Sequence, residues 1–229
     1  MCGLVEVVHV INLLDTGLKT YTAMDTLQRE LHARIATGQH PNTFLIFEAE
    51  STYTAGRHTQ QHDILDDALS IIDTDRAGSV TWHGPGQLVC YPLVKLAAPV
   101  DVIKYIRAVE GAVLDTLRDH FGLDVGVIEG RAGVWIGNRK ISAVGLKISQ
   151  DATLHGISLN VNTDPATAFA GVIPCGITDA TVTSMAEEGV PTTLAAVAEP
   201  LTAALEHRLE PLLAPITTEG DVNVYHPAG

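Results

Sequence analysis

The chain has 229 residues, of which 46% are hydrophobic and 18% charged, a balance that predicts a folded globular protein and excludes a disordered one. Its formal net charge of −13 argues against general nucleic-acid binding, because contacts to phosphates need surface Lys and Arg. Three cysteines are too few for a disulfide framework, and no apolar run reaches the roughly 18 residues of a membrane helix. We therefore predict a single domain, residues 1–229, located in the cytoplasm.

The first half of the chain alternates strand and helix patterns. Residues 1–14 are apolar but lack the basic start and small-residue end of a signal peptide, so they predict a strand. Apolar residues at three- and four-residue steps predict a helix over 21–38, which Gly38 ends. The β-branched and aromatic residues that follow predict strands over 43–50, 79–82 and 87–96.

A second helix is predicted over 101–122, between an Asp101 cap and Gly122. As a long crossover, it is expected to cover one face of a sheet. Its inner face is predicted to consist of Ile103, Ile106, Val109, Val113 and Leu117.

The second half predicts strands over 132–137, 139–149 and 154–162, with a tight hairpin at Gly137-Asn138. Short turns between strands favour antiparallel pairing, so the fold class is α+β, a mixed, mostly antiparallel sheet flanked by helices. After a loop at 172–177, Thr178 or Asp179 is expected to cap a short helix. The last helix, from about Thr193 to Leu209, should kink or restart at Pro200.

Charge is distributed unevenly along the chain. Residues 57–147 hold ten basic and eleven acidic side chains, whereas 148–229 hold one basic and ten acidic. The acidic C-terminal segment could therefore be a small appendage. In the middle, either the charges are scattered in water or the basic residues form a patch for an acidic partner. That patch would consist of Arg57, Arg76, Arg131, Arg139, Lys140 and Lys147.

Two stretches in the centre can approach a ligand. His83-Gly84-Pro85-Gly86 joins two predicted strands, and its amide groups can come close to a bound molecule, although such turns are often only turns. After the hairpin, Arg139 and Lys140 must point to opposite faces of a regular strand. One of them can therefore face a pocket, where a lysine would pair with an anion.

The cysteines have different expected roles. Cys175 lies in a Pro-Cys-Gly loop just before a predicted helix start, where amide groups favour a thiolate. Cys90 lies within an apolar strand and is expected to pack as a small hydrophobe. His155, also in an apolar strand, is most simply a satisfied core residue. His58 and His62 with Asp63 could share a helix face, but no Glu lies between them, so a metal site is not favoured.

Four motifs in this order, RAGSVTWHGPGQLVCY, RKISAVGLK, LHGISLNVN and PCGITDATVTS, resemble the octanoyltransferases of lipoate biosynthesis. The resemblance spans roughly residues 40–185 and departs from the family pattern at Ala77 and Ser142. It implies the fold of lipoate and biotin protein ligases. It also implies transfer of an octanoyl group from acyl carrier protein to a lysine of lipoyl domains, without ATP or another cofactor. These domains belong to 2-oxoacid dehydrogenase complexes and the glycine cleavage H protein.

The resemblance further implies that Cys175 carries the acyl group as a thioester and that Lys140 lowers its pKa. Lys140 or His83 would then accept a proton from the incoming lysine. Backbone amides near Gly176 or in the His-Gly-Pro-Gly loop are candidates for an oxyanion site. The implied substrate-binding residues are Arg76, Ala77, Gly78, Ser79, Val80, Thr81, Trp82, His83, Ala143, Val144, Gly145, Gly156, Ile157 and Ser158.

Three other functions remain open at this point. A ligase of the same fold would consume ATP, and a cysteine thioesterase would give the acyl group to water. A silent acyl-binding protein would hold the chain without chemistry at Cys175.

Overall fold

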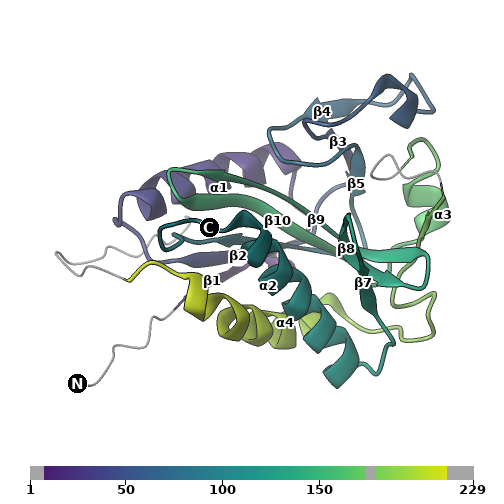
Figure 1. Ribbon diagram of the computed structural model, residues 1–229. Coiled ribbons are helices and arrows are strands. Elements are labelled where there is room, and N and C mark those ends of the chain that lie inside the picture. Colours follow the sequence, from purple (N-terminus) through teal and green to yellow (C-terminus); the bar gives the residue numbers. More distant parts are fainter. Residues whose placement is uncertain (1–7, 174–178, 216–229) are drawn as a thin grey trace.

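The computed structural model describes residues 8–173 and 179–215 of the chain. Its centre is a sheet with the strand order β1-β2-β6-β10-β9-β8-β7, and β11 pairs with β9 outside this path (Figure 1). The β1–β2 and β11–β9 pairs are parallel and the other pairs are antiparallel. The predicted mixed, mostly antiparallel sheet is therefore confirmed.

The strands of this sheet are β1 (His9–Asn12), β2 (Thr43–Phe47), β6 (Gln87–Leu93), β7 (Gly126–Ile128), β8 (Arg131–Ile136), β9 (Arg139–Ser149), β10 (Ala152–Asn160) and β11 (Thr181–Val182). The predicted 139–149 strand has the observed bounds, and Gly137 turns the hairpin before it with φ +56°. A second sheet, in the order β4-β3-β5, consists of β3 (Thr52–Ala55), β4 (Ile71–Asp73) and β5 (Thr81–His83).

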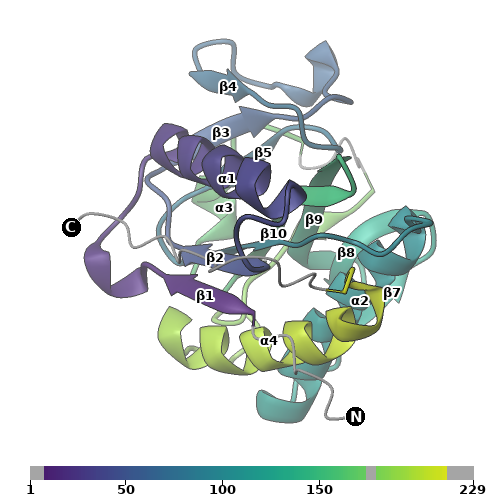
Figure 2. The same cartoon turned by 90° about the vertical axis from the view of Figure 1, so that its left-hand side faces the viewer.

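Helices cover both faces of the main sheet (Figures 1 and 2). The helix α1 (Tyr21–Ala36) packs on one face, and α2 (Val102–Asp115) and α4 (Leu194–Leu209) pack on the other. The shorter helices are α3 (Pro165–Ala168), η1 (Leu14–Thr16), η2 (Gln61–Asp63), the π-helix η3 (Thr116–His120) and η5 (Glu210–Leu212). None of the helices in the described part of the chain is both long and apolar enough to cross a membrane.

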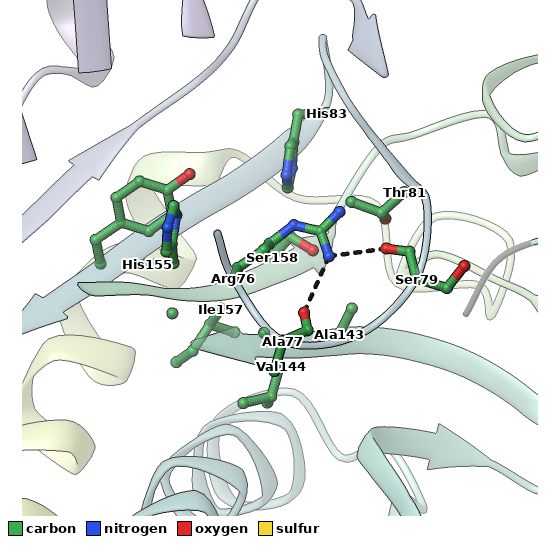
Figure 3. A pocket seen from close by; sticks show the side chains of 14 residues that line it. Arg76, Ala77, Ser79, Thr81, His83, Ala143, Val144, His155, Ile157 and Ser158 are labelled. Carbon is green, nitrogen blue, oxygen red and sulfur yellow. Dashed lines mark hydrogen bonds between the residues drawn. The ribbon is translucent and has the colours of Figure 1, made fainter. Parts of the chain in front are cut away.

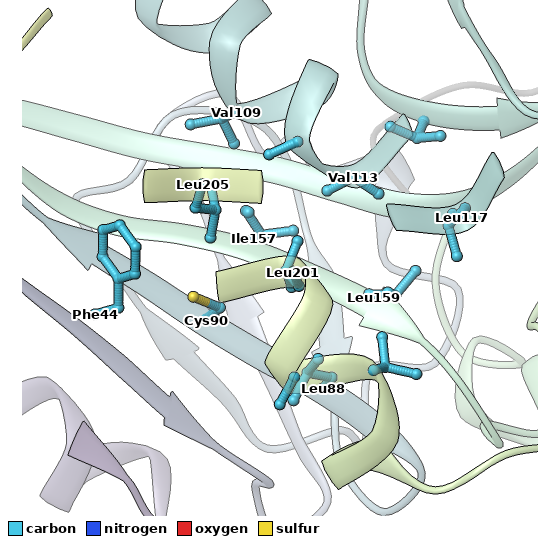
Figure 4. Close-up of a cluster of buried hydrophobic side chains, with 14 of the residues drawn as sticks. Phe44, Leu88, Cys90, Val109, Val113, Leu117, Ile157, Leu159, Leu201 and Leu205 are labelled. Atoms are coloured by element: carbon cyan, nitrogen blue, oxygen red, sulfur yellow. The ribbon is translucent and has the colours of Figure 1, made fainter. Parts of the chain in front are cut away.

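Alternation along the central strands creates two cores. In β6, Leu88 and Cys90 face α2 and α4, whereas Val89 and Tyr91 face α1. The larger core joins Leu88 and Cys90 of β6 to Val109, Val113, Leu117, Leu201 and Leu205 of the helices (Figure 4). Because α4 supplies fully buried side chains to this core, the C-terminal segment to this point packs into the main body and is not an appendage.

The helix predictions hold with three corrections. The Asp101 side chain caps α2, which confirms that prediction. Thr20 and Thr193 cap α1 and α4 through their side-chain oxygens in the same way. Ile103, however, is 66% exposed, because it lies on the outer side of α2. Pro200 does not restart a segment, since α4 runs through it without interruption.

The third correction is the short helix expected after Thr178 or Asp179. Thr178 lies outside the described residues, and beyond Asp179 the chain forms the strand β11 instead. Thr181 and Val182 pair with Arg139 and Lys140 of β9. Two adjacent β-branched residues favour this sheet edge over a helix.

Candidate active site

A narrow pocket of about 50 Å³ lies where the loop 76–80 and β5 meet β9 and β10 (Figure 3). This space exceeds the roughly 10–15 Å³ that one water needs. We call it the central pocket. Its lining residues are Arg76, Ala77, Gly78, Ser79, Thr81, His83, Tyr91, Ala143, Val144, Gly145, His155, Gly156, Ile157 and Ser158.

The structure brings together every predicted substrate-binding residue except Val80 and Trp82. Both side chains are buried, but neither lines the central pocket. Successive residues of an extended chain point to opposite sides, so Thr81 and His83 line the pocket while Trp82 points away. The Trp82 indole instead packs edge-on against Phe169 and donates a hydrogen bond to Ser51 Oγ at 2.9 Å.

Arg76 organises the loop that forms one wall. Its Nη1 atom donates to the carbonyl oxygens of Ala77 (3.1 Å) and Ser79 (2.8 Å), as Figure 3 shows. Its Nη2 atom donates to the carbonyl and hydroxyl oxygens of Thr54, at 2.8 and 2.9 Å. The guanidinium group thus ties the loop to β3, so its first role is to shape the pocket wall.

Two glycines let the walls approach closely. A Cβ at Gly145 would lie 3.1 Å from the carbonyl oxygen of Ala77, and one at Gly156 would lie 2.5 Å from that of Cys90. Both contacts are closer than real Cβ atoms normally make with neighbours that cannot move away. Glycine is therefore required at both positions because the neighbouring backbone leaves no room for a side chain, and the pocket also needs this space.

The His-Gly-Pro-Gly loop is held in place by close contacts of Gly86 with other parts of the chain. Gly86 has φ +83°, and a Cβ on it would lie 2.7 Å from the backbone of Asn162. Its N–H donates to Glu48 Oε1 at 2.7 Å, so this one amide of the loop is already used within the fold. The other candidate region, near Gly176, lies outside the described residues.

His83 is buried beside this loop, stacked on Tyr21 with ring centres 6.2 Å apart. Its Nδ1 atom lies 2.7 Å from Gln87 Oε1, which accepts from the imidazole N–H. Burial is the main cause that lowers the pKa of His83 to about 4. The imidazole is therefore neutral near pH 7.

Sequence reasoning missed two lining residues, Tyr91 and His155. His155 has φ +59° and is 1% exposed, and its Nε2 atom contacts Asp75 Oδ1 at 2.8 Å. It is indeed a satisfied buried histidine, as expected, but it also lines the pocket. A histidine followed by glycine in an apolar strand was the available clue to this position.

Lys140 is buried while its neighbour Arg139 is exposed and paired with Glu188, which confirms the predicted alternation. The Lys140 Nζ atom lies 4.7 Å from the centre of the Trp135 ring. Lys140 also lines a small cavity whose other walls include Thr81, Ala143 and Ser158 of the central pocket. The lysine is therefore held in the interior beside the central pocket.

Cys175 lies outside the described residues, but the chain on either side of 174–178 is anchored at the site. The N–H of Ile173 donates to the carbonyl oxygen of Asp63 at 2.7 Å, and the Asp63 carboxylate accepts from the Ser79 hydroxyl. On the other side, Asp179 accepts two hydrogen bonds from Arg131 at 2.8 and 2.9 Å.

A wider groove of about 970 Å³ opens next to the central pocket. Four of the six residues proposed for a basic patch line it, whereas Arg76 lines the central pocket and Arg139 lies elsewhere. We call it the basic groove. Its lining residues are Arg57, His58, Asp75, Ala77, Gly78, Ser79, Val102, Ile106, Gly130, Arg131, Ala132, Lys140, Val144, Leu146, Lys147 and Ile148.

Other candidate groups have simpler roles. Cys90 is 1% exposed in the larger core, and burial raises the pKa of its thiol to about 12, so its expected packing role is confirmed. His58 precedes the short helix η2 and does not share a helix face with His62. Within residues 8–173 and 179–215, no group of three or more His, Cys, Asp or Glu side chains is arranged to hold a metal.

Comparison with known proteins places the chain among lipoyl enzymes. Residues 20–206 match the lipoyl protein ligase A/B catalytic domain. The octanoyltransferase of Salinispora arenicola is 44% identical over 192 residues, which cover 81% of this chain and 89% of the relative. The octanoyltransferase of Mycobacterium tuberculosis is 44% identical over 182 residues, covering 78% and 77%.

Solved structures share the fold at much lower identity. Lipoate-protein ligase A bound with ATP has a TM-score of 0.69 at 16% identity, covering 90% of this chain and 86% of that chain. A biotin protein ligase from Aquifex aeolicus, in complex with biotin and ATP, has a TM-score of 0.56 at 16% identity, covering 88% and 70%. These likenesses confirm the predicted fold.

Proposed function

The chain belongs to the family of lipoyl protein ligase A/B catalytic domains, and on that premise we propose that it transfers an octanoyl group from octanoyl-acyl carrier protein to a specific lysine of lipoyl domains. It is an acyltransferase of the lipoyl transferase class. The observation that carries the finer proposal is the buried Lys140 beside a narrow pocket whose walls come from three separate predicted motifs.

The pocket suits an acyl tail. Small residues, Ala143, Gly145 and Gly156, line its strand side, and Val144 and Ile157 add apolar surface. Burying about seven methylene and methyl groups at roughly 0.8 kcal/mol each contributes at most about 5 kcal/mol to binding. Such a pocket can select chain length, because its volume is fixed by backbone contacts.

We assign Cys175 as the nucleophile. Its thiolate attacks the thioester carbonyl, a new C–S bond forms, and the bond to the pantetheine sulfur breaks. Lys140 first takes the Cys175 proton and then returns it to the released pantetheine thiolate. The anchoring of Ile173 and Asp179 at the site supports this assignment.

In the second half-reaction, the neutral amine of the acceptor lysine attacks the Cys175 thioester. An amide bond forms, the C–S bond breaks, and the amine proton passes through Lys140 to the departing Cys175 sulfur. We assign this transfer to Lys140 and not to His83, because a histidine with a pKa of about 4 is too weak a base for an ammonium proton.

The proposal includes no cofactor, and intact-mass measurement tests it directly. The protein is incubated with octanoyl-acyl carrier protein without ATP, and the mass of one octanoyl group should be added. A lipoyl domain supplied next should remove that mass and become octanoylated. An adduct that survives Cys175→Ala would exclude Cys175 as the nucleophile.

An ATP-dependent ligase is the second candidate, because neighbours of the same fold are known with bound ATP. A ligase would activate free octanoate and would need ATP for any transfer. Full transfer from the thioester without ATP would exclude it. Release of free octanoate without modification of the lipoyl domain would instead indicate a thioesterase, and a bound but unreacted thioester would indicate a silent acyl-binding protein.

A further inference from the structure

Basic residues outnumber acidic residues in the lining of the basic groove, whereas acidic residues outnumber basic ones in the whole chain. The chain has 14 Lys and Arg residues against 27 Asp and Glu. The groove is lined by four of these basic residues and by one acidic residue, Asp75. In a protein of net charge −13, this segregation produces a local surface that attracts acidic groups.

The same groove has an apolar floor. Val102 is 43% exposed at the first turn of α2, and Ile106 follows one turn later on the same side of the helix. Val144, Leu146 and Ile148 line the opposite side from β9. An occupant of this groove therefore needs apolar groups as well as negative charge.

The groove leads to the proposed catalytic site. It shares Ala77, Gly78, Ser79 and Val144 with the central pocket, and it shares Lys140 with the small cavity. A molecule that lies along the groove can thus place its end at the entrance of the central pocket.

We propose that the basic groove docks the acyl donor, an acidic carrier protein, and that the 4′-phosphopantetheine arm lies along the Val102 and Ile106 floor. This inference rests on the proposed function, which supplies the donor. The arm carries one phosphate at its protein end and a thioester at the other, with methyl, methylene and amide groups between. Its negative and apolar parts match the rim and floor of the groove.

The dimensions favour the donor over the acceptor. A lysine side chain is a short, single aliphatic chain, and it does not need a groove of about 970 Å³. An acceptor domain must instead bring its surface close to the thioester. A phosphopantetheine arm is much longer, and it requires a path between the carrier protein and the central pocket.

Arg57 is the rim cation best placed to meet the donor. It is exposed, and within the described part of the chain its side chain has no ion-pair partner. Arg131 pairs with Asp179 and Lys147 pairs with Asp75, so their charges are partly compensated. Arginine also binds phosphate through two parallel hydrogen bonds, which suits the protein end of the arm.

The test compares Arg57→Glu with Lys19→Glu, which makes the same charge reversal at a partly exposed lysine outside the groove. The rate of acylation is measured by intact mass with octanoyl-carrier protein and with octanoyl-pantetheine, which has neither protein nor phosphate. Arg57→Glu should slow acylation by the carrier protein roughly tenfold, and far more than acylation by octanoyl-pantetheine. Lys19→Glu should leave the rates with both donors unchanged. Val102→Glu, at an exposed helix N-terminus that tolerates acidic residues, should slow acylation by both donors, because both carry the pantetheine that is proposed to contact Val102.

The transfer of octanoate from preloaded enzyme to a lipoyl domain is measured in parallel. A loss confined to this second step would overturn the inference and place the acceptor in the groove. Arg57→Glu that slows acylation equally with both donors, or with neither, would also overturn it, and so would Val102→Glu that slows neither. If the unmodified protein is acylated by neither donor, the proposed function itself fails, and this result is distinct from a docking failure.

Discussion

The imidazole Nε2 of His155 lies 2.8 Å from Oδ1 of Asp75, at the junction between the central pocket and the basic groove. The carboxylate accepts from this N–H, so the Nδ1 atom is left to accept from Gln28 Nε2 at 3.2 Å. Asp75 also accepts from Arg29 at 3.0 Å and from Lys147 at 2.9 Å. One carboxylate therefore joins α1, β9 and β10 beneath the site.

Asp75→Asn should lower the free energy of unfolding by about 1–2 kcal/mol. It removes the charge that Arg29, Lys147 and His155 share, although Asp75 is partly exposed and solvent screens part of the loss. The matched control is Asp115→Asn, which breaks the exposed pair with Arg208 and should cost less than about 1 kcal/mol. Urea denaturation measures both, and equal losses would contradict a special role for Asp75.

Stability should decrease as the pH falls from about 6.5 towards 4. The pKa of His83 is lowered from 6.5 to about 4 by burial, so the unfolded chain binds a proton that the folded chain does not. This contribution is fully present above pH 6.5 and is lost as the pH approaches 4, on the order of 3 kcal/mol in all. Burial also lowers the pKa of His155, which acts in the same direction.

The measurement is a series of urea titrations between pH 4 and 8. His83→Gln should make the curve of stability against pH less steep, because it removes one of the buried histidines whose pKa is lowered. A variant whose curve runs parallel to that of the unmodified protein would show that His83 does not cause the effect.

Lys140→Met should slow acylation by octanoyl-carrier protein roughly 100-fold, because it removes the amino group that takes the Cys175 proton while keeping the buried aliphatic stem. The pH profile should move upward, towards the ordinary thiol pKa of about 8.5. The adjacent Arg139→Gln is the control, since Arg139 is exposed, points to the opposite face and pairs with Glu188. An unchanged profile in Lys140→Met would remove the proposed role of Lys140.

Ala143→Val should shorten the preferred acyl chain. Ala143 lines the central pocket beside Ser158, its partner on the neighbouring strand, and two added methyl groups would narrow the space. Discrimination changes by about 1–3 kcal/mol per methylene, so octanoyl transfer should fall at least several-fold relative to butanoyl transfer. Acylation rates with C4 to C12 thioesters measure this preference, and the same rank order in both proteins would contradict the assignment of the pocket to the acyl tail.

The sequence patterns predicted most of the main sheet and its three long helices. The 139–149 strand and the Asp101 and Gly38 helix ends follow from local chemistry, namely β-branched alternation, a capping carboxylate and a glycine stop. The strands β3, β4 and β7 were missed. They have three or four residues each, which is too short for a clear alternation pattern, and β3 and β4 also depend on pairing with each other across a long loop.

The candidate site also contains residues that sequence motifs predict and residues whose position depends on the fold. The sequence motifs alone predict Arg76, His83, Gly145 and Ser158 at the pocket, and all four line it, because a motif depends only on the order of residues. Val80 and Trp82 do not line the central pocket, since the direction of their side chains depends on how the chain is oriented against it.

Local patterns along the chain were enough to establish the fold class, the helices and the order of the reactive motifs, because helix periodicity, strand alternation and capping act over a few residues. Long-range packing established the rest. It buried Lys140 beside the pocket, committed the Gly86 amide to Glu48 and joined Asp75 to His155 across 80 residues of sequence. It also gathered the basic residues into one groove of an acidic protein. These relationships depend on pairing between distant strands, which no short stretch of sequence encodes.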